Sequence, residues 1–190
     1  MAVMIDKMTF DVLISREQIE ERVRELGRQI TQDYEGKNPI LMIVLNGGFI
    51  FGADLMRAIN TQCEVDFIKI SSYGDQLTST GEVKMKKDYD SLVGGRHILV
   101  VEDIVDSGLS LSFLKHKFEL QQPASVRFVS LLHKPDNSRL AFELDYVGFE
   151  IGPEFVVGFG LDYKQNWRNL PAIFVRVDSR PEGRENGQSS

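Results

Sequence analysis

The chain has 190 residues, 42% of them hydrophobic, which is enough to bury the core of one domain with some additions. Its net charge of −6 argues against an extended surface for nucleic acid. The single cysteine, Cys63, excludes a disulfide within the chain, and no secretory leader or long apolar run is visible. These features predict a soluble cytoplasmic protein that contacts neither nucleic acid nor membrane.

The first elements are a helix, a strand and a second helix. Ser15 and Gln18 have the spacing of a capping box, and apolar residues then recur on one helical face, at Ile19, Val23, Leu26 and Ile30. Residues 38–46 form a continuous apolar run of strand length. The glycine pair at 47–48 breaks this run before the amphipathic stretch FIFGADLMRAIN.

Strands and helices continue to alternate along the middle of the chain. A strand at 65–72 is followed by a polar, glycine-punctuated stretch up to residue 95, whose length predicts a functional lid or a disordered segment. Strands are then predicted at 97–101 and 125–134, with a helix between them whose inner face is Leu111, Leu114 and Phe118. The alternation predicts an α/β fold, a mainly parallel sheet with helices on both faces and ligands beyond the carboxyl ends of its strands.

The last third of the chain consists of short β-rich pieces, which predict a small hood beside the main sheet. We expect one domain over residues 1–177. Its core would span about 36–150, and its hood would come from the N-terminal segment and about 151–177. Residues 178–190 carry almost no apolar side chain to bury and are expected to form a mobile tail.

The stretch ILVVEDIVDSGLSL, residues 98–111, combines a buried strand with three carboxylates and a polar turn. The turn opens a helix, so its first backbone N–H groups are free to bind an anion, and Gly108 lets the backbone approach it. Ser107 and Ser110 add hydroxyl donors, which favours a phosphate monoester. Glu102 and Asp103 could then accept hydrogen bonds from sugar hydroxyls or help to hold a divalent cation. The alternative is that Asp106 or Ser107 only caps the helix and that the carboxylates are solvated.

Neither a nucleoside-triphosphatase loop nor a complete dinucleotide fingerprint occurs in the chain. VVEDIVDSGLS instead resembles the phosphoribosyl pyrophosphate signature of type I phosphoribosyltransferases. Further segments between residues 10 and 177 resemble, in order, the pyrophosphate loop, the mobile catalytic loop, the purine-contacting strand end and the hood of hypoxanthine-guanine phosphoribosyltransferases. These segments are VLNGGFIFGADL, SSYGDQLTSTGEVKM, SLLHKP and EFVVGFGLDYKQNWRNLPAI.

The resemblance implies a type I phosphoribosyltransferase fold and a purine-salvage reaction that needs Mg²⁺. Phosphoribosyl pyrophosphate and a 6-oxopurine, hypoxanthine or guanine, would give the nucleoside monophosphate and pyrophosphate. It also implies a homo-oligomer, a dimer or tetramer. Two alternatives stay open: a regulator on the same fold that binds phosphoribosyl pyrophosphate, and a transferase for another base such as xanthine.

The resemblance also implies a role for each matching residue. Asp106 would accept the proton from purine N7, and the loop that holds the 5′-phosphate would comprise Asp106, Ser107, Gly108, Leu109 and Ser110. The ribose and the metal would be bound by Glu102 and Asp103, with Asp162 near the metal and the purine. Lys134 would contact the 6-oxo group of the purine, and Phe155 and Val156 would contact its ring. Pyrophosphate would be bound by Asn46, Gly47 and Arg168, and the tip of the lid would be Ser72 and Tyr73.

Two positions depart from the family pattern. Asn46 stands where many members of the family carry lysine in the pyrophosphate loop, and Leu109 stands where some carry lysine in the phosphate loop. The first departure removes a positive charge near pyrophosphate. The resemblance further suggests a cis peptide bond between Asn46 and Gly47.

Overall fold

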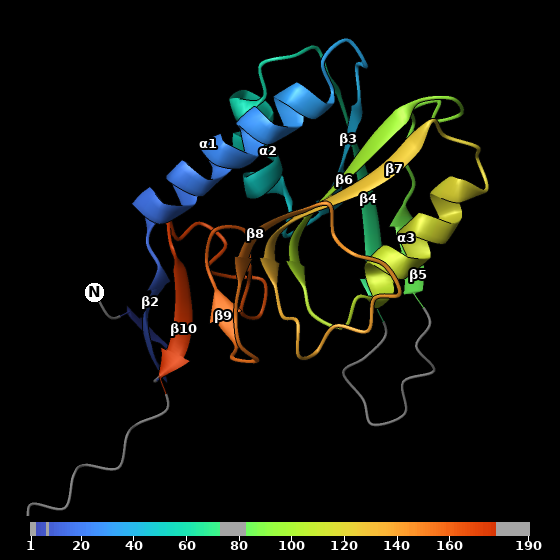
Figure 1. Ribbon diagram of the computed structural model, residues 1–190. Coiled ribbons are helices and arrows are strands. Elements are labelled where there is room, and N and C mark those ends of the chain that lie inside the picture. The colour runs from blue at the N-terminus through green and yellow to red at the C-terminus, as the bar shows by residue number, and fades with distance from the viewer. Residues whose placement is uncertain (1–2, 7, 73–82, 178–190) are drawn as a thin grey trace, which may run out of the picture.

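The computed structural model describes residues 3–6, 8–72 and 83–177 and contains two sheets (Figure 1). The main sheet has six strands in the order β5-β4-β3-β6-β7-β8. Its neighbours are parallel except for the antiparallel pair of β4 and β5. In chain order its strands are β3 (Ile40–Leu45), β4 (Glu64–Ser72), β5 (Val83–Lys87), β6 (His97–Val105), β7 (Ser125–His133) and β8 (Tyr146–Glu150). This is the mainly parallel α/β sheet that the sequence predicted.

Helices cover both faces of the main sheet, as predicted. The helices α1 (Arg16–Asp33) and α2 (Phe49–Ala58) bury their apolar side chains in one core, with Leu41, Ile43 and Val101 of the sheet. Helix α3 (Leu109–Glu119) packs on the opposite face through Leu111, Leu114 and Phe118. Strands β3 and β6 are buried from both sides, which explains their continuous apolar runs.

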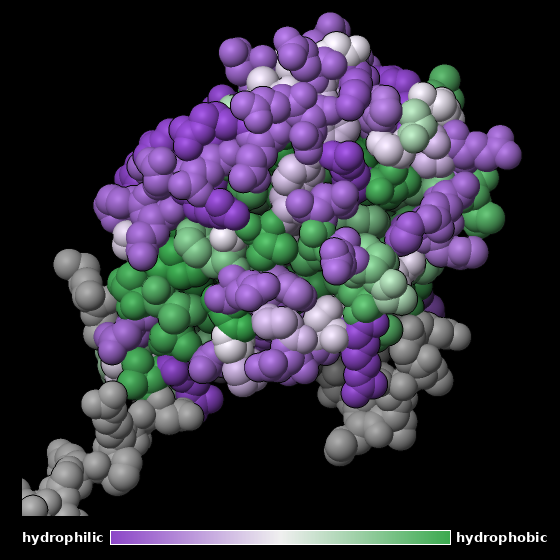
Figure 2. Space-filling view, viewed as in Figure 1, coloured by the Kyte–Doolittle hydropathy of each residue, from purple (hydrophilic) through white to green (hydrophobic). Residues whose placement is uncertain are grey.

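Helix α1 begins with the predicted capping box. The Ser15 hydroxyl accepts from Gln18 N at 3.3 Å, and Gln18 Oε1 accepts from Ser15 N at 2.8 Å. Two otherwise unpaired backbone donors are thereby satisfied. The helix buries Ile19, Val23 and Leu26 and presents its charged face outward, as the hydrophilic band of Figure 2 shows.

The second sheet is small and antiparallel, with the order β1-β2-β10-β9. It joins β1 (Val3–Ile5) and β2 (Met8–Ile14) near the N-terminus to β9 (Val156–Val157) and β10 (Ile173–Val177). Phe10, Val157 and Phe174 form its core. We call this sheet, together with the loops between β8 and β10, the hood. It lies beside the main sheet (Figure 1).

Strand β5 differs from the sequence-based expectation, because it lies within the polar stretch that was expected to be a functional lid or disordered. Its Val83 and Met85 are partly buried, and the exposed Lys84 lies between them. Strand β8 lies within the predicted core limits of 36–150 and pairs parallel with β7 in the main sheet. The remainder of the predicted lid, residues 73–82, and the predicted tail, 178–190, lie outside the described residues.

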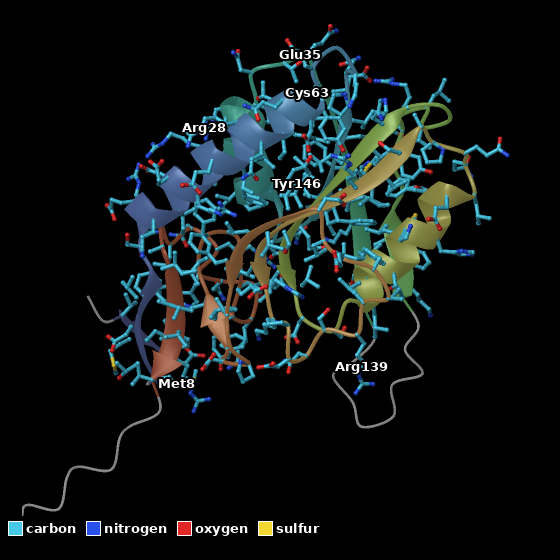
Figure 3. The ribbon with its side chains drawn as sticks, viewed as in Figure 1. Met8, Arg28, Glu35, Cys63, Arg139 and Tyr146 are labelled. Carbon is cyan, nitrogen blue, oxygen red and sulfur yellow. The ribbon has the colours of Figure 1, made fainter. Side chains whose placement is uncertain are left out.

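The two ends of the main sheet are marked in Figure 3 by Glu35 and Arg139. Glu35 lies just before β3 begins, whereas the Arg139 backbone N donates to Ser107 O at 3.1 Å, beyond the end of β6. The carboxyl ends of the parallel strands therefore lie on the side of Arg139. In the described part of the chain, no helix is both long and apolar enough to cross a membrane.

Candidate active site

The end of β6 carries two buried carboxylates. Glu102 and Asp103 are each 8% exposed, and Glu102 Oε2 has no hydrogen-bond partner among the described residues. Burial, and the neighbouring charge of Asp103, raise the pKa of Glu102 well above its ordinary value. Burial also raises the pKa of Asp103, although Ile104 N donates to its Oδ1 at 3.0 Å. A bound cation or hydrogen-bond donors would therefore stabilise the charged form of these two buried carboxylates.

The loop after β3 lies directly against this pair. A Cβ atom on Gly47 would stand 1.6 Å from Asp103 Oδ2, and one on Gly160 would stand 2.2 Å from Gly47 O. Three segments distant in sequence therefore meet here, and only glycine fits at both contacts. The cis peptide bond of this loop joins Leu45 and Asn46, one residue earlier than the resemblance suggested.

The turn between β6 and α3 is the place where the sequence predicts an anion site. Gly108, the residue before the helix, adopts a left-handed conformation with φ of 79° and has no side chain to cap α3. Leu109 N donates to Ser107 Oγ at 3.4 Å, and the first N–H groups of a helix have no partner within the helix itself. A cavity of about 190 Å³ opens at this place. Its lining residues are Glu102, Ile104, Val105, Asp106, Ser107, Gly108, Ser110 and Leu111. Leu109, the remaining loop residue, is exposed.

Asp106 is joined to the end of β7 by a buried lysine. Lys134 is only 6% exposed, and its Nζ donates to Asp106 Oδ2 at 3.2 Å and to Pro153 O at 3.4 Å. Asn137 Nδ2 donates to the other carboxylate oxygen of Asp106 at 3.0 Å. One ammonium group thus connects the predicted proton acceptor to the segment that enters the hood.

The hood contributes an exposed aromatic ring to the same end of the molecule. Phe155, two residues after Pro153, is 47% exposed although its ring makes T-shaped contacts with Phe10 and Tyr163, with ring centroids 6.5 and 5.9 Å apart. Val156 follows in β9, where its side chain is buried and it pairs with Val175 of β10. The hood therefore holds the Phe155 ring between two aromatic neighbours and leaves nearly half of the side chain exposed.

Arg168 and Asp162 form an ion pair in the hood loop between β9 and β10. Arg168 Nη2 lies 2.7 Å from Asp162 Oδ1, and Nη1 donates to Gly160 O at 2.7 Å. Asp162 Oδ2 also accepts from Gln165 N at 2.7 Å. The positive charge of Arg168 acts on Asp103, where it opposes the pKa increase caused by burial. Arg168 is thus held close to the carboxylates of β6.

Most of the predicted site residues gather at the carboxyl end of the main sheet and the facing hood. Ser72 ends β4 at this edge; its side chain, and Tyr73, lie outside the described residues. Asp162 is engaged by Arg168, and no group of three or more possible metal ligands occurs in the ranges that the structure covers.

Sequence reasoning missed Asn137 and Lys69. Lys69 Nζ donates to Asn46 Oδ1 at 3.1 Å. Because side chains alternate along a strand, Lys69 lies on the same face of β4 as Phe67. No sequence signal indicated that Lys69 would contact Asn46.

The chain matches the phosphoribosyl transferase domain family over residues 14–164. It is 48% identical over 164 residues to the hypoxanthine-guanine phosphoribosyltransferase of Bacillus subtilis, covering 86% of this chain and 91% of that protein. It is 43% identical over 172 residues to the protein of the same name from Streptococcus thermophilus, covering 90% and 96%. A Listeria innocua relative named bifunctional protein TilS/HprT is 49% identical over 86% of this chain, but the match spans only 25% of that longer protein.

Solved structures agree with the sequence matches. The crystal structure of a hypoxanthine-guanine phosphoribosyltransferase from Bacillus anthracis, with a HEPES molecule in its active site, superposes with a TM-score of 0.83 at 47% identity. The superposition covers 88% of this chain and 98% of that one. A hypoxanthine phosphoribosyltransferase from Staphylococcus aureus superposes with a TM-score of 0.84 at 38% identity, covering 88% of this chain and 91% of that one.

Proposed function

The chain belongs to the phosphoribosyl transferase family, and we propose that it is a purine-salvage enzyme. It transfers the 5-phosphoribosyl group from phosphoribosyl pyrophosphate to hypoxanthine and to guanine, with IMP or GMP and pyrophosphate as products. The relatives named above carry this activity in their names and are similar over most of this chain.

The choice of a 6-oxopurine is supported by the position of the buried Lys134, which lies beside Asp106 at the same end of the molecule as the exposed Phe155 ring. An ammonium has donors and no acceptor, so it favours a 6-oxo group over a 6-amino group. Asp106 accepts the N7 proton, which makes the ring a better nucleophile. Phe155 stacks on the purine, and the backbone of Val156 contacts the edge of the base.

The phosphoribosyl group is bound at the cavity between β6 and α3. The 5′-phosphate accepts hydrogen bonds from the loop 106–110, where the helix N-terminus and the hydroxyls of Ser107 and Ser110 supply donors. The two carboxylates at the end of β6 accept from the ribose hydroxyls. Neutral hydroxyl donors explain why acidic residues can stand beside a phosphate site.

Glu102 and Asp103 would also hold Mg²⁺, and the unpartnered Glu102 Oε2 in this buried pair fits such an ion. Two carboxylates suffice because Mg²⁺ in such sites usually takes further oxygens from water and substrate phosphates. Asp162 would reach the ion only through water, since its carboxylate is paired with Arg168. When bound, Mg²⁺ neutralises charge that develops on the departing pyrophosphate.

Pyrophosphate leaves between the loop at Asn46 and Gly47 and the hood residue Arg168. Ser72 and Tyr73 begin the lid that excludes water from the reacting sugar. We further propose that the enzyme is cytoplasmic and acts as a dimer or tetramer.

A product assay tests the proposal directly. The protein is incubated with phosphoribosyl pyrophosphate, Mg²⁺ and, separately, hypoxanthine, guanine, xanthine, adenine, uracil and orotate, and nucleotide and pyrophosphate are both measured. We expect IMP and GMP with hypoxanthine and guanine. Conversion of another base alone would contradict the substrate assignment, and binding of phosphoribosyl pyrophosphate with no product from any base would favour a regulator.

A further inference from the structure

We propose that Lys69 is the cation that binds pyrophosphate beside the loop 46–48, and that it orients the Asn46 amide toward the same ligand. This inference rests on the proposed function and names a residue that it did not include. It starts from the strand register, in which Lys69 of β4 lies opposite Leu45 of β3, immediately before the loop. From there Lys69 Nζ reaches Asn46 Oδ1 at 3.1 Å.

The contact fixes which end of the Asn46 amide faces outward. An ammonium can only donate, so the atom that faces Lys69 must be the amide oxygen. The amide NH₂ of Asn46 is then directed away from Lys69. An otherwise ambiguous side chain thereby offers two donors, which suit a phosphate oxygen and not a cation.

The charges around the site leave Lys69 as an uncompensated cation. Arg168 is paired with Asp162, and Lys134 is paired with Asp106. Lys69 contacts only the neutral Asn46 amide among the residues that the structure describes. The highly charged pyrophosphate group would otherwise meet the acidic Glu102 and Asp103 with little net positive charge from the protein. Lys69 can offset the negative charge of pyrophosphate because the neutral Asn46 amide leaves the positive charge of the ammonium group uncompensated.

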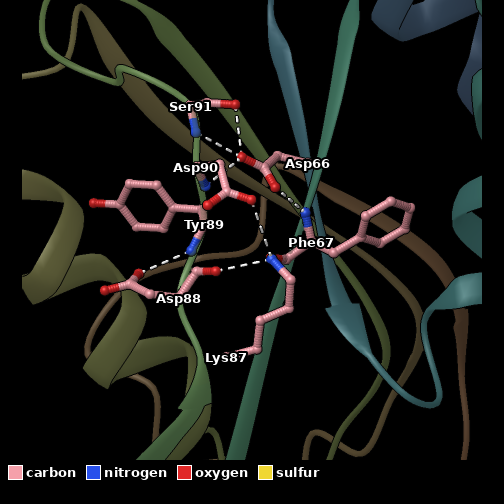
Figure 4. Close-up of polar contacts among 7 residues, drawn as sticks. All are labelled: Asp66, Phe67, Lys87, Asp88, Tyr89, Asp90 and Ser91. Carbon is pink, nitrogen blue, oxygen red and sulfur yellow. Dashed lines mark hydrogen bonds and ion pairs between the residues drawn. The ribbon is translucent and has the colours of Figure 1, made fainter.

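The lysine opposite Lys69 in the sheet is engaged elsewhere. Lys87 of β5 pairs with Lys69 across the ladder, but its Nζ donates to Phe67 O at 3.0 Å and to Asp88 O at 2.8 Å (Figure 4). Asp66 holds the segment that follows by accepting from Asp90 N and Ser91 N, both at 2.8 Å. Lys87 is thus tied to the sheet edge, and Lys69 is the lysine of this pair that reaches the loop.

Binding of inorganic pyrophosphate with Mg²⁺, measured by calorimetry, tests the inference without relying on turnover. We expect Lys69→Met to weaken binding by about tenfold or more, since hydrogen bonds to charged groups contribute at least that factor. Lys69→Arg should stay within about threefold of the wild type because it keeps the charge. Lys37→Met, which removes one exposed lysine just before β3, is the matched control and should bind like the wild type.

Two further measurements separate the effect of the Lys69 charge on pyrophosphate binding from the effect of the shape of its side chain. The difference between wild type and Lys69→Met should shrink as ionic strength rises, because salt screens a half-exposed charge. In Asn46→Lys/Lys69→Met the charge is moved onto the loop, and we expect much of the lost affinity to return. The inference is overturned if Lys69→Met binds pyrophosphate as tightly as the control, or if Lys69→Arg loses as much as Lys69→Met. A wild type that forms no nucleotide would instead reject the proposed function.

Discussion

Gly47 and Asp103 are in such close contact that no side chain fits between them: a Cβ atom on Gly47 would lie 1.6 Å from Oδ2 and 2.4 Å from the carboxyl carbon of Asp103. Asp103 is short and buried, so its carboxylate cannot move aside as the end of a long side chain could. The backbone of the loop after β3 is thus part of the wall that positions the β6 carboxylates.

We therefore expect Gly47→Ala to displace Asp103 and to impair substrate binding more than folding. The KM for phosphoribosyl pyrophosphate should rise by about tenfold or more, and more Mg²⁺ should be needed for half-maximal rate, since a small misplacement of catalytic groups is costly. Steady-state kinetics with Mg²⁺ titration measure both. Gly94→Ala is the control, because a Cβ there meets nothing closer than Gln121 O at 3.4 Å. Unchanged KM and Mg²⁺ dependence in Gly47→Ala would contradict the prediction.

The buried charge of Glu102 makes the unliganded protein less stable at high pH. The pKa of Glu102 is raised above 4.5, so the folded state keeps a proton that the unfolded state has released. The free energy of unfolding therefore falls as pH rises from about 4.5 through the folded pKa. Glu102→Gln removes this loss. We expect its melting temperature at pH 8 to exceed that of the wild type by roughly 2–4 °C, which corresponds to about 1 kcal/mol.

Thermal unfolding without Mg²⁺, followed from pH 4 to pH 8, measures this effect. The gap between Glu102→Gln and wild type should close toward pH 4, where Glu102 is protonated in both states. Glu35→Gln, a change at an exposed carboxylate, should follow the wild type at every pH. A Glu102→Gln protein that is no more stable than the wild type at pH 8 would show that the buried charge is compensated within the protein.

Most elements of the main sheet could be predicted from the sequence because they have local signals. Ser15 and Gln18 mark a helix start, the run at 40–45 marks a buried strand, and a polar turn follows β6. The residues of the predicted phosphate loop line one cavity because they are nearly consecutive. Strand β5 was missed because its short alternation of valine and methionine with lysines was read as part of a polar loop.

Contacts between distant segments could not be predicted in this way. Lys69 meets Asn46 through the register of two parallel strands, and Gly47 meets Asp103 through the packing of two loops. No characteristic spacing of residues in the sequence indicates either contact. The roles assigned to the individual site residues came from the resemblance, and the variants described here test them.

Asp106→Asn should lower turnover while leaving phosphoribosyl pyrophosphate binding largely intact. The amide cannot take up the N7 proton, and general-base catalysis usually contributes at least about 10²-fold. The donors that we propose for the 5′-phosphate are mostly backbone and hydroxyl groups, so the KM for phosphoribosyl pyrophosphate should change little. Asp136→Asn, at an exposed carboxylate two residues beyond Lys134, is the control. Undiminished turnover of Asp106→Asn would remove this carboxylate from the mechanism.

Lys134→Gln should change the choice of base. The lysine is buried and donates to Asp106 and to Pro153 O, so the donor that we propose for the 6-oxo group has its position fixed from two sides. Glutamine can present its carbonyl oxygen to a 6-amino group instead. We expect kcat/KM for hypoxanthine to fall by about tenfold to a hundredfold, with a rise in the adenine to hypoxanthine ratio.

Competition between hypoxanthine and adenine, with both nucleotide products measured, gives that ratio directly. The KM for phosphoribosyl pyrophosphate serves as the internal control, because Lys134 lies outside the loop 106–110 and does not line the cavity between β6 and α3. If the ratio stays unchanged while overall activity falls, Lys134 holds Asp106 in position but does not select the base. Asp106→Asn and Lys134→Gln would then have the same effect, since both would act through the one carboxylate that the two residues share.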